Sequence, residues 1–156
     1  MDQGPLTMVT GGPFLRKVIT GEDRRMERSI RNEVFIVEQS VPPELEFENE
    51  EGSTHYLLLT HNGAVGCARY RWVGHDIKLE RIAVKRRERG KGYGRILVEC
   101  LLNEVRPLRP RTIYLNSQTS VKGFYERFGF TAVGKVFLEA GIEHIKMVLK
   151  QEEKGL

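Results

Sequence analysis

Residues 84–95 read Val-Lys-Arg-Arg-Glu-Arg-Gly-Lys-Gly-Tyr-Gly-Arg and decide the fold of this chain. A strand-like apolar run, 77–84, precedes them, and an apolar helical pattern, 96–105, follows. The stretch carries six cations against one anion, and its glycines occupy alternate positions. Because glycine tolerates positive φ, several backbone N–H groups can face one concavity at the helix N-terminus. The pattern therefore predicts a loop that binds phosphates.

The spacing of the glycines narrows the class of loop. A Walker loop needs Ser or Thr after its lysine, and none follows Lys91; the dinucleotide fingerprint fails because position 95 is Arg. Arg89-Gly90-Lys91-Gly92-Tyr93-Gly94 does fit Arg/Gln-x-x-Gly-x-Gly/Ala. This hexapeptide resembles the acetyl-coenzyme A loop of the GCN5-related N-acetyltransferase (GNAT) superfamily. The alternative is a solvated basic turn.

Length and composition place the chain among single-domain globular proteins. Of 156 residues, 40% are hydrophobic and 29% charged, and the net charge is +4. We expect a flexible leader at 1–13, one domain at 14–150 and a polar tail at 151–156. The sequence contains neither a signal peptide nor a membrane-spanning apolar run, and its two cysteines, Cys67 and Cys100, fall in apolar patterns. These features predict a cytoplasmic protein with reduced core thiols.

Hydrophobic periodicity predicts an α/β fold, an α+β mixed sheet with helices on its faces, in the order β-α-β-β-β-α-β-α-β-β. Strands are expected at 15–20, 55–60, 64–72, 77–84, 112–116, 130–136 and 144–149. Helices are expected from the N-cap Thr20 through the stripe Met26, Ile30, Val34 and Val37, then over 96–105 and 119–128.

Two charged segments have a simple and a functional interpretation. The arginines of the first helix are expected on a solvated face, or alternatively to contact phosphate or an acidic partner: Arg24, Arg25, Arg28 and Arg31. Five glutamates within residues 44–51 are expected in an exposed loop rather than the core. Alternatively, they form an acidic rim that attracts a cationic amine substrate.

The second half of the chain strengthens the GNAT resemblance. Gly123-Phe124-Tyr125-Glu126-Arg127-Phe128-Gly129-Phe130 is similar to the family's Phe/Leu-Tyr-x-x-x-Gly-Phe segment, about thirty residues after the loop, and the element order agrees. The resemblance spans roughly residues 15–150. Residues 31–39 and 137–147 further resemble a small bacterial subgroup, the YjcF/ElaA-like proteins.

The resemblance implies acetyl-CoA as co-substrate and assigns residues to it. The N–H groups of residues 89–94 would hold the diphosphate, assisted by the cations Arg89, Lys91 and Arg95. The pantetheine would lie along Ile82, Ala83 and Val84, and the Val84 N–H would polarise the thioester carbonyl. Many members carry Asn seven residues before the helix Tyr; here Gln118 stands there, so Gln118 and, second, Asn116 are candidates. The cofactor-binding set also includes Gly90, Gly92, Tyr93, Gly94 and Phe124.

Acetyl transfer needs a proton for the leaving thiolate and a base for the amine. The resemblance assigns Tyr125 as general acid; otherwise it packs on the core. We take Glu80 as the candidate base, because period-2 alternation places it on the face of Lys78, Ile82 and Val84. A structural salt bridge between Glu80 and a nearby arginine is an equal alternative.

We expect the protein to be an acyltransferase that transfers the acetyl group of acetyl-CoA directly to a small-molecule amine in a ternary complex. Alternatives are an amino-sugar phosphate N-acetyltransferase, a non-catalytic CoA or acyl-CoA binding module, and a nucleic-acid-binding protein that uses the loop cations. We expect no nucleic-acid partner, no membrane association and no metal, and homodimer formation stays open.

Overall fold

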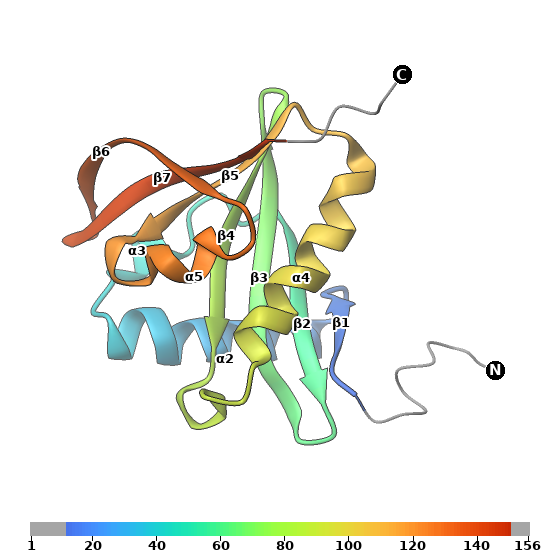
Figure 1. Ribbon diagram of the computed structural model, residues 1–156. Coiled ribbons are helices and arrows are strands. Elements are labelled where there is room, and N and C mark those ends of the chain that lie inside the picture. Colours follow the sequence, from blue (N-terminus) through green and yellow to red (C-terminus); the bar gives the residue numbers. More distant parts are fainter. Residues whose placement is uncertain (1–11, 151–156) are drawn as a thin grey trace.

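Seven strands form one sheet in the computed structural model, which describes residues 12–150 (Figure 1). The spatial order is β1-β2-β3-β4-β5-β7-β6, and every neighbouring pair is antiparallel except β4 and β5. The strands are β1 (Phe14–Lys17), β2 (Thr54–Thr60), β3 (Gly63–Val73), β4 (Asp76–Val84), β5 (Thr112–Gln118), β6 (Thr131–Glu139) and β7 (Ile142–Lys150). The predicted mixed sheet is confirmed. The predicted tail and most of the predicted leader lie outside the described residues.

Helices cover both faces of the sheet (Figure 1). They are α2 (Gly21–Arg31), which continues into a π-helix (Asn32–Glu38), α3 (Pro43–Glu46), α4 (Tyr93–Val105) and α5 (Lys122–Glu126). Helix α3 was not predicted; the other elements follow the predicted order. No helix in residues 12–150 is both long and apolar enough to cross a membrane.

Each face of the sheet has its own hydrophobic cluster. On one face, Leu97 and Leu101 of α4 are fully buried against β-strand residues such as Ile77 and Ile113. On the other face, α2 and the π-helix bury Ile30 and Val34 against a second cluster that includes Leu57, Leu59, Cys67 and Ala83. Burial on both faces explains why the central strands read as continuous apolar runs.

The first helix begins as predicted and ends differently. Thr20 Oγ1 accepts a hydrogen bond from the Asp23 N–H at 3.0 Å, which confirms the N-cap. Val34 is buried as predicted, but Val37 is 69% exposed. The wider π-helical turn rotates residues away from the 3.6-residue period, so the predicted stripe does not extend to Val37.

A β-bulge in β4 changes which side chains share a face. Arg69 of β3 lies opposite Glu80, whereas Cys67 lies opposite Ala83, so β4 contains one extra residue between these pairs. The extra residue coincides with Arg81, whose φ is +56°. Glu80 and Ala83 consequently share one face, while Ile82 and Val84 pack with the α4 cluster on the other. The predicted common face of Glu80, Ile82 and Val84 is therefore wrong.

The parallel strands β4 and β5 separate after a short paired stretch. Their register runs only from Ile77↔Ile113 to Leu79↔Leu115. Asp76 ties the paired end together, because it accepts hydrogen bonds from the Thr112 hydroxyl at 2.7 Å and from Arg111. Beyond Leu79, the backbone of β4 is no longer bonded to β5, and this opening in the sheet holds the site described next.

Candidate active site

A cavity of about 490 Å³ occupies the opening between β4 and β5. Its walls come from the π-helix, α3, β4, the loop before α4, β5, α5 and the β6–β7 turn. The structure brings most of the predicted site to this cavity: Glu80, Ile82, Ala83, Val84, Arg89, Gly90, Gly92, Tyr93, Gly94, Asn116, Gln118, Phe124 and Tyr125. Lys91 and Arg95 are not among its lining residues. The roles of all these residues stay predictions.

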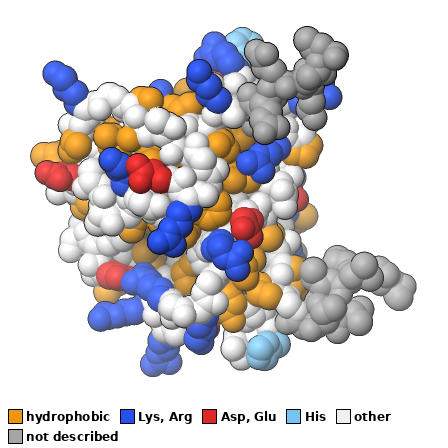
Figure 2. All heavy atoms as spheres, in the orientation of Figure 1, with side chains coloured by type: hydrophobic (Ala, Val, Ile, Leu, Met, Phe, Trp, Pro, Cys, Tyr) orange, Lys and Arg blue, Asp and Glu red, His pale blue; other side chains and the backbone are white. Residues whose placement is uncertain are grey.

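The glycine loop has the backbone geometry of an anion site. Gly90 and Gly92 have φ of +81° and +84°. Gly92 precedes the first residue of α4, and no side chain caps that helix end. The first-turn N–H groups of α4 are thus available to a negatively charged ligand, and the helix dipole favours one. Figure 2 shows Lys and Arg side chains gathered at the lower end of the viewed face, where this loop lies in Figure 1.

Each predicted phosphate-binding cation has a carboxylate partner on the surface. Arg89 donates two hydrogen bonds to Glu38, at 2.8 and 2.9 Å, and this contact lowers the pKa of Glu38. Lys91 pairs with Glu88 at 3.0 Å, and Arg95 pairs with Glu99 at 3.2 Å. Exposed ion pairs contribute only ~0–1 kcal/mol each, so a diphosphate can compete for these cations at little cost.

Tyr125 combines burial of its ring with a hydroxyl that has no protein partner. The residue is 8% exposed, and its ring packs edge-to-face against Phe124 and Phe130 at 5.0 and 6.1 Å. Within residues 12–150 no hydrogen bond to its hydroxyl is found, and the residue lines the cavity. Burial raises the pKa of the Tyr125 phenol, so it stays protonated near neutral pH. It can therefore donate a proton or hydrogen bond to a group in the cavity.

Gln118 occupies the place where the family often has Asn. Its side-chain nitrogen donates to Gln39 Oε1 at 2.9 Å, which connects β5 to the residue that follows the π-helix. Asn116 lines the same cavity, and no hydrogen bond of its side chain is found in the described part of the chain. Both amides thus line the cavity; the Asn116 amide has no protein partner among the described residues, and Gln118 keeps its carbonyl oxygen and second N–H for a ligand.

Glu80 is surrounded by cations. Arg69 lies 2.9 Å from Glu80 Oε1, and Arg71 and Lys78 each lie 3.0 Å from its carboxylate oxygens. Burial alone would raise the pKa of Glu80, but the field of Arg69 and the bonds from Arg71 and Lys78 lower it to about 2. A carboxylate with so low a pKa is a weak base. The contacts thus favour the alternative interpretation, a structural salt bridge.

Glu80→Gln is expected to lower the free energy of unfolding by ~2–3 kcal/mol at pH 7, because three cations lose their counter-charge. The lowered pKa makes this contribution present above about pH 4.5 and lost as the pH falls toward 2, so the two unfolding curves should converge in acid. Urea unfolding at several pH values measures the difference. Glu99→Gln, in an exposed pair, is the control. Loss of turnover with unchanged stability would instead support Glu80 as the base.

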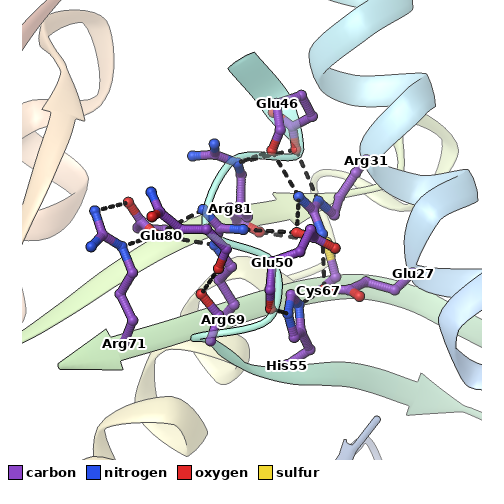
Figure 3. A network of polar contacts seen from close by, with 12 residues as sticks. Glu27, Arg31, Glu46, Glu50, His55, Cys67, Arg69, Arg71, Glu80 and Arg81 are labelled. Atoms are coloured by element: carbon purple, nitrogen blue, oxygen red, sulfur yellow. Dashed lines mark hydrogen bonds and ion pairs between the residues drawn. The ribbon is translucent and has the colours of Figure 1, made fainter. Parts of the chain in front are cut away.

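The acidic segment is exposed as predicted at Glu44, Glu48 and Glu51, but the prediction is wrong for Glu46 and Glu50, which belong to a structural network. Glu46 is 2% exposed and accepts from the Arg31 Nε at 2.9 Å, and Arg31 is itself 0% exposed. Glu50 lies between Arg31 and Arg69, 2.8 Å from each (Figure 3). Burial raises the pKa of Glu46, while the bond from Arg31 keeps that of Glu50 low. The predicted solvated face holds for the exposed Arg24, Arg25 and Arg28 but is wrong for Arg31.

One group in the same network has the donors of a metal site. Ligand atoms of Glu27, Glu50 and His55 lie within 4.8 Å of one another. However, Arg31 already lies 3.5 Å from Glu27 and 2.8 Å from Glu50, and the bond from Glu27 raises the pKa of His55 despite its burial. Arg31 thus already supplies positive charge to both carboxylates. The expected absence of a metal stays a prediction.

A sequence profile of the acetyltransferase (GNAT) domain family matches residues 18–151, so the chain belongs to this family. Within it, the chain is YjcF/ElaA-like. It is 33% identical over 138 residues to the N-acetyltransferase named YjcF of Bacillus subtilis. The aligned region covers 86% of this chain and 99% of YjcF.

Solved structures share the fold. An acyl-CoA N-acyltransferase from Pseudomonas aeruginosa has a TM-score of 0.78 at 25% sequence identity, and the superposition covers 88% of this chain and 97% of that one. Escherichia coli ElaA has a TM-score of 0.77 at 23% identity, with 88% of this chain and 99% of ElaA covered. A GNAT acetyltransferase from Elizabethkingia anophelis, solved with acetyl-CoA bound, has a TM-score of 0.70 at 16% identity, with 89% of this chain and 98% of that chain covered. The family makes this protein an acyltransferase.

Sequence reasoning missed two sets of residues at the site. Glu38 and Glu33 of the π-helix hold the loop, since Glu33 accepts from the Arg86 backbone N–H at 2.9 Å. His144 also lines the cavity, and no role was predicted for it. The available signals were its position at the start of the predicted strand 144–149 and its place within residues 137–147, which resemble the YjcF/ElaA-like subgroup.

Proposed function

We propose that this protein transfers the acetyl group of acetyl-CoA directly to an amine acceptor while both are bound. The observation that carries this proposal is one continuous cavity with the glycine loop at one end and the unpartnered Tyr125 hydroxyl in its wall. The diphosphate would bind the loop, and the pantetheine would run along Ala83 and Val84, toward Tyr125. The acetyl-CoA bound to the E. anophelis relative supports this donor.

In this scheme the acceptor amine attacks the thioester carbon and the carbon–sulfur bond breaks. The departing thiolate takes the proton of the Tyr125 hydroxyl, and the amine nitrogen gives up a proton to a base. Desolvation in the cavity raises the basicity of the thiolate as well as the pKa of the phenol, so the transfer stays close to balanced. The products are an amide and free CoA.

The charges at the cavity favour a cationic amine as the acceptor. Glu48 and Glu139 line it, and neither has a cationic partner among the described residues. The cations Lys78 and Arg81 also line it, but they pair with Glu80 and Glu46 at 3.0 and 3.2 Å. An amino-sugar phosphate, the second candidate acceptor, would need a free cation there. The two free carboxylates thus support the acidic rim proposed from the sequence, reduced to Glu48 and joined by Glu139.

Release of free thiol from acetyl-CoA, measured with a panel of monoamines, diamines and amino-sugar phosphates, tests this function. Turnover with a cationic amine supports the proposal. CoA binding without turnover on any amine would favour the non-catalytic binding module instead. We also propose a cytoplasmic location, where the described free thiols of Cys67 and Cys100 would stay reduced.

Gly92→Glu is expected to raise the acetyl-CoA Kd about tenfold or more, because a carboxylate would face the diphosphate and a side chain would strain the positive φ. Isothermal titration calorimetry measures the Kd. Gly74→Glu is the matched control, since Gly74 also has a positive φ of +62° with open space around its Cβ and does not line the cavity. Equal Kd values for the two variants would contradict the loop assignment.

A further inference from the structure

His144 has a defined tautomer at the cavity wall. Its Nδ1 lies 2.7 Å from the carbonyl oxygen of Ile142. A carbonyl oxygen can only accept, so Nδ1 carries the hydrogen and the neutral ring presents Nε2 as a lone-pair acceptor. The Phe137 ring stacks on the imidazole with centroids 6.0 Å apart and planes 25° apart, which fixes the ring orientation.

The other bases at the cavity are occupied or exposed. Glu80 pairs with three cations, and Glu46 is buried against Arg31 and Arg81. Glu48 and Glu139 are exposed carboxylates without a partner to orient them. Of the described side chains that line the cavity, His144 is the one imidazole, and its contacts with Ile142 and Phe137 hold it in a single orientation.

Strand pairing fixes the face of the sheet on which His144 lies. His144 lies directly across from Gln118 of β5, and the next pair on the same face is Asn116 with Lys146. Alternate residues of these strands, Leu115 and Met147, face the other way into the cluster that contains Tyr125. The His144 side chain thus belongs to the sheet face opposite the cluster that contains Tyr125, and both residues line the cavity.

We propose that His144 is the general base that accepts the proton of the acceptor amine. The inference rests on the proposed function. The amine nitrogen forms a bond to the thioester carbon and loses a proton to Nε2, while the carbon–sulfur bond breaks and the thiolate takes the Tyr125 proton. The imidazolium then releases its proton to solvent, and the Tyr125 phenolate takes one up from solvent.

His144→Gln tests the role, since glutamine keeps a polar side chain and cannot accept the proton. With acetyl-CoA and a primary amine that the wild type uses, we expect kcat to fall roughly 10²-fold and the acetyl-CoA Kd to stay within about twofold. His75→Gln, in the β3–β4 turn away from the cavity, is the control. Imidazole in the buffer should partly restore turnover to His144→Ala, which leaves room for it.

The pH profile is a second readout. The acid limb of kcat/KM should be less steep in His144→Gln than in the wild type, because only the ionisation of the acceptor amine then remains. Charged groups on the neighbouring strands and at the same cavity act electrostatically on the His144 imidazole: Glu139, Glu143, Lys146, Lys78 and Glu80. Nitrogen-15 NMR of the imidazole gives a readout without turnover, with the Nδ1–H tautomer expected.

The outcomes separate the two proposals. Wild-type turnover with an unaffected His144→Gln, or an Nε2–H tautomer, overturns the role of His144 and leaves the acetyltransferase standing. Absence of wild-type turnover on every amine overturns the proposed function and the base with it. Loss of turnover in His144→Gln together with a matching loss of acetyl-CoA affinity would make His144 a binding residue and overturn its role as base.

Discussion

Arg31→Met is expected to lower the free energy of unfolding by ~3–5 kcal/mol, because it leaves buried carboxylates without their cation. Glu46 and Glu27 are both 2% exposed, and Arg31 is fully buried between them. Methionine fills much of the same volume, so the loss reports the missing charge and hydrogen bonds rather than a cavity. Urea unfolding followed by circular dichroism measures it.

Two further variants make this prediction specific. Arg95→Met removes an ion pair whose arginine side chain is 62% exposed. It should lower the free energy of unfolding by less than ~1 kcal/mol. Arg31→Lys keeps the charge but removes the planar fork that reaches Glu46 and Glu50 at once, so an intermediate loss is expected. It also remains measurable if Arg31→Met does not fold. Equal, small losses for Arg31→Met and Arg95→Met would contradict the role of the network.

The network matters for function because it positions one wall of the cavity. Arg31 stands at the junction of α2 and the π-helix, and its partner Glu46 ends α3. The π-helix and α3 supply Val34, Phe35 and Leu45 to the cavity. The ion pairs therefore hold this wall of the cavity against the sheet. Because Glu48 of the proposed acidic rim lies just after α3, the conservative variant Arg31→Lys should also raise the KM for the amine.

Local patterns predicted most of the fold. The apolar repeats of α4 and the strands, the Thr20 cap and the glycine loop depend on residues close in sequence, and the structure confirms these elements. The family resemblance then predicted that segments distant in sequence form one site. Pairings across long sequence separations could not be predicted. The burial of Arg31 depends on Glu46, fifteen residues on, and on the fold that encloses both.

Backbone irregularities account for the remaining differences. One extra residue at Arg81 reverses the alternation of β4, which moved Ile82 and Val84 away from the face of Glu80. Likewise, the site of His144 depends on β7 lying between β5 and β6, a pairing that composition does not encode. A period-2 pattern assumes regular pleating, so it fails where the strand bulges to open the cavity.

Tyr125→Phe is expected to lower kcat by ~10²–10⁴, because the leaving thiolate loses its proton donor. The ring keeps its edge-to-face contacts with Phe124 and Phe130, so the fold and the acetyl-CoA Kd should change little. Steady-state thiol release with the best amine of the panel measures kcat. Tyr70→Phe, a partly buried tyrosine stacked on Tyr56 and outside the cavity, is the matched control.

Comparison across pH separates an acid from a packing residue. Because burial raises the pKa of the Tyr125 phenol, the wild-type acid stays protonated through the alkaline range in which the acceptor amine becomes neutral. Turnover of the wild type should therefore persist at alkaline pH, while Tyr125→Phe stays low at every pH. Full turnover of Tyr125→Phe over the whole range would reduce Tyr125 to a packing residue. In that case a water molecule in the cavity would have to protonate the thiolate.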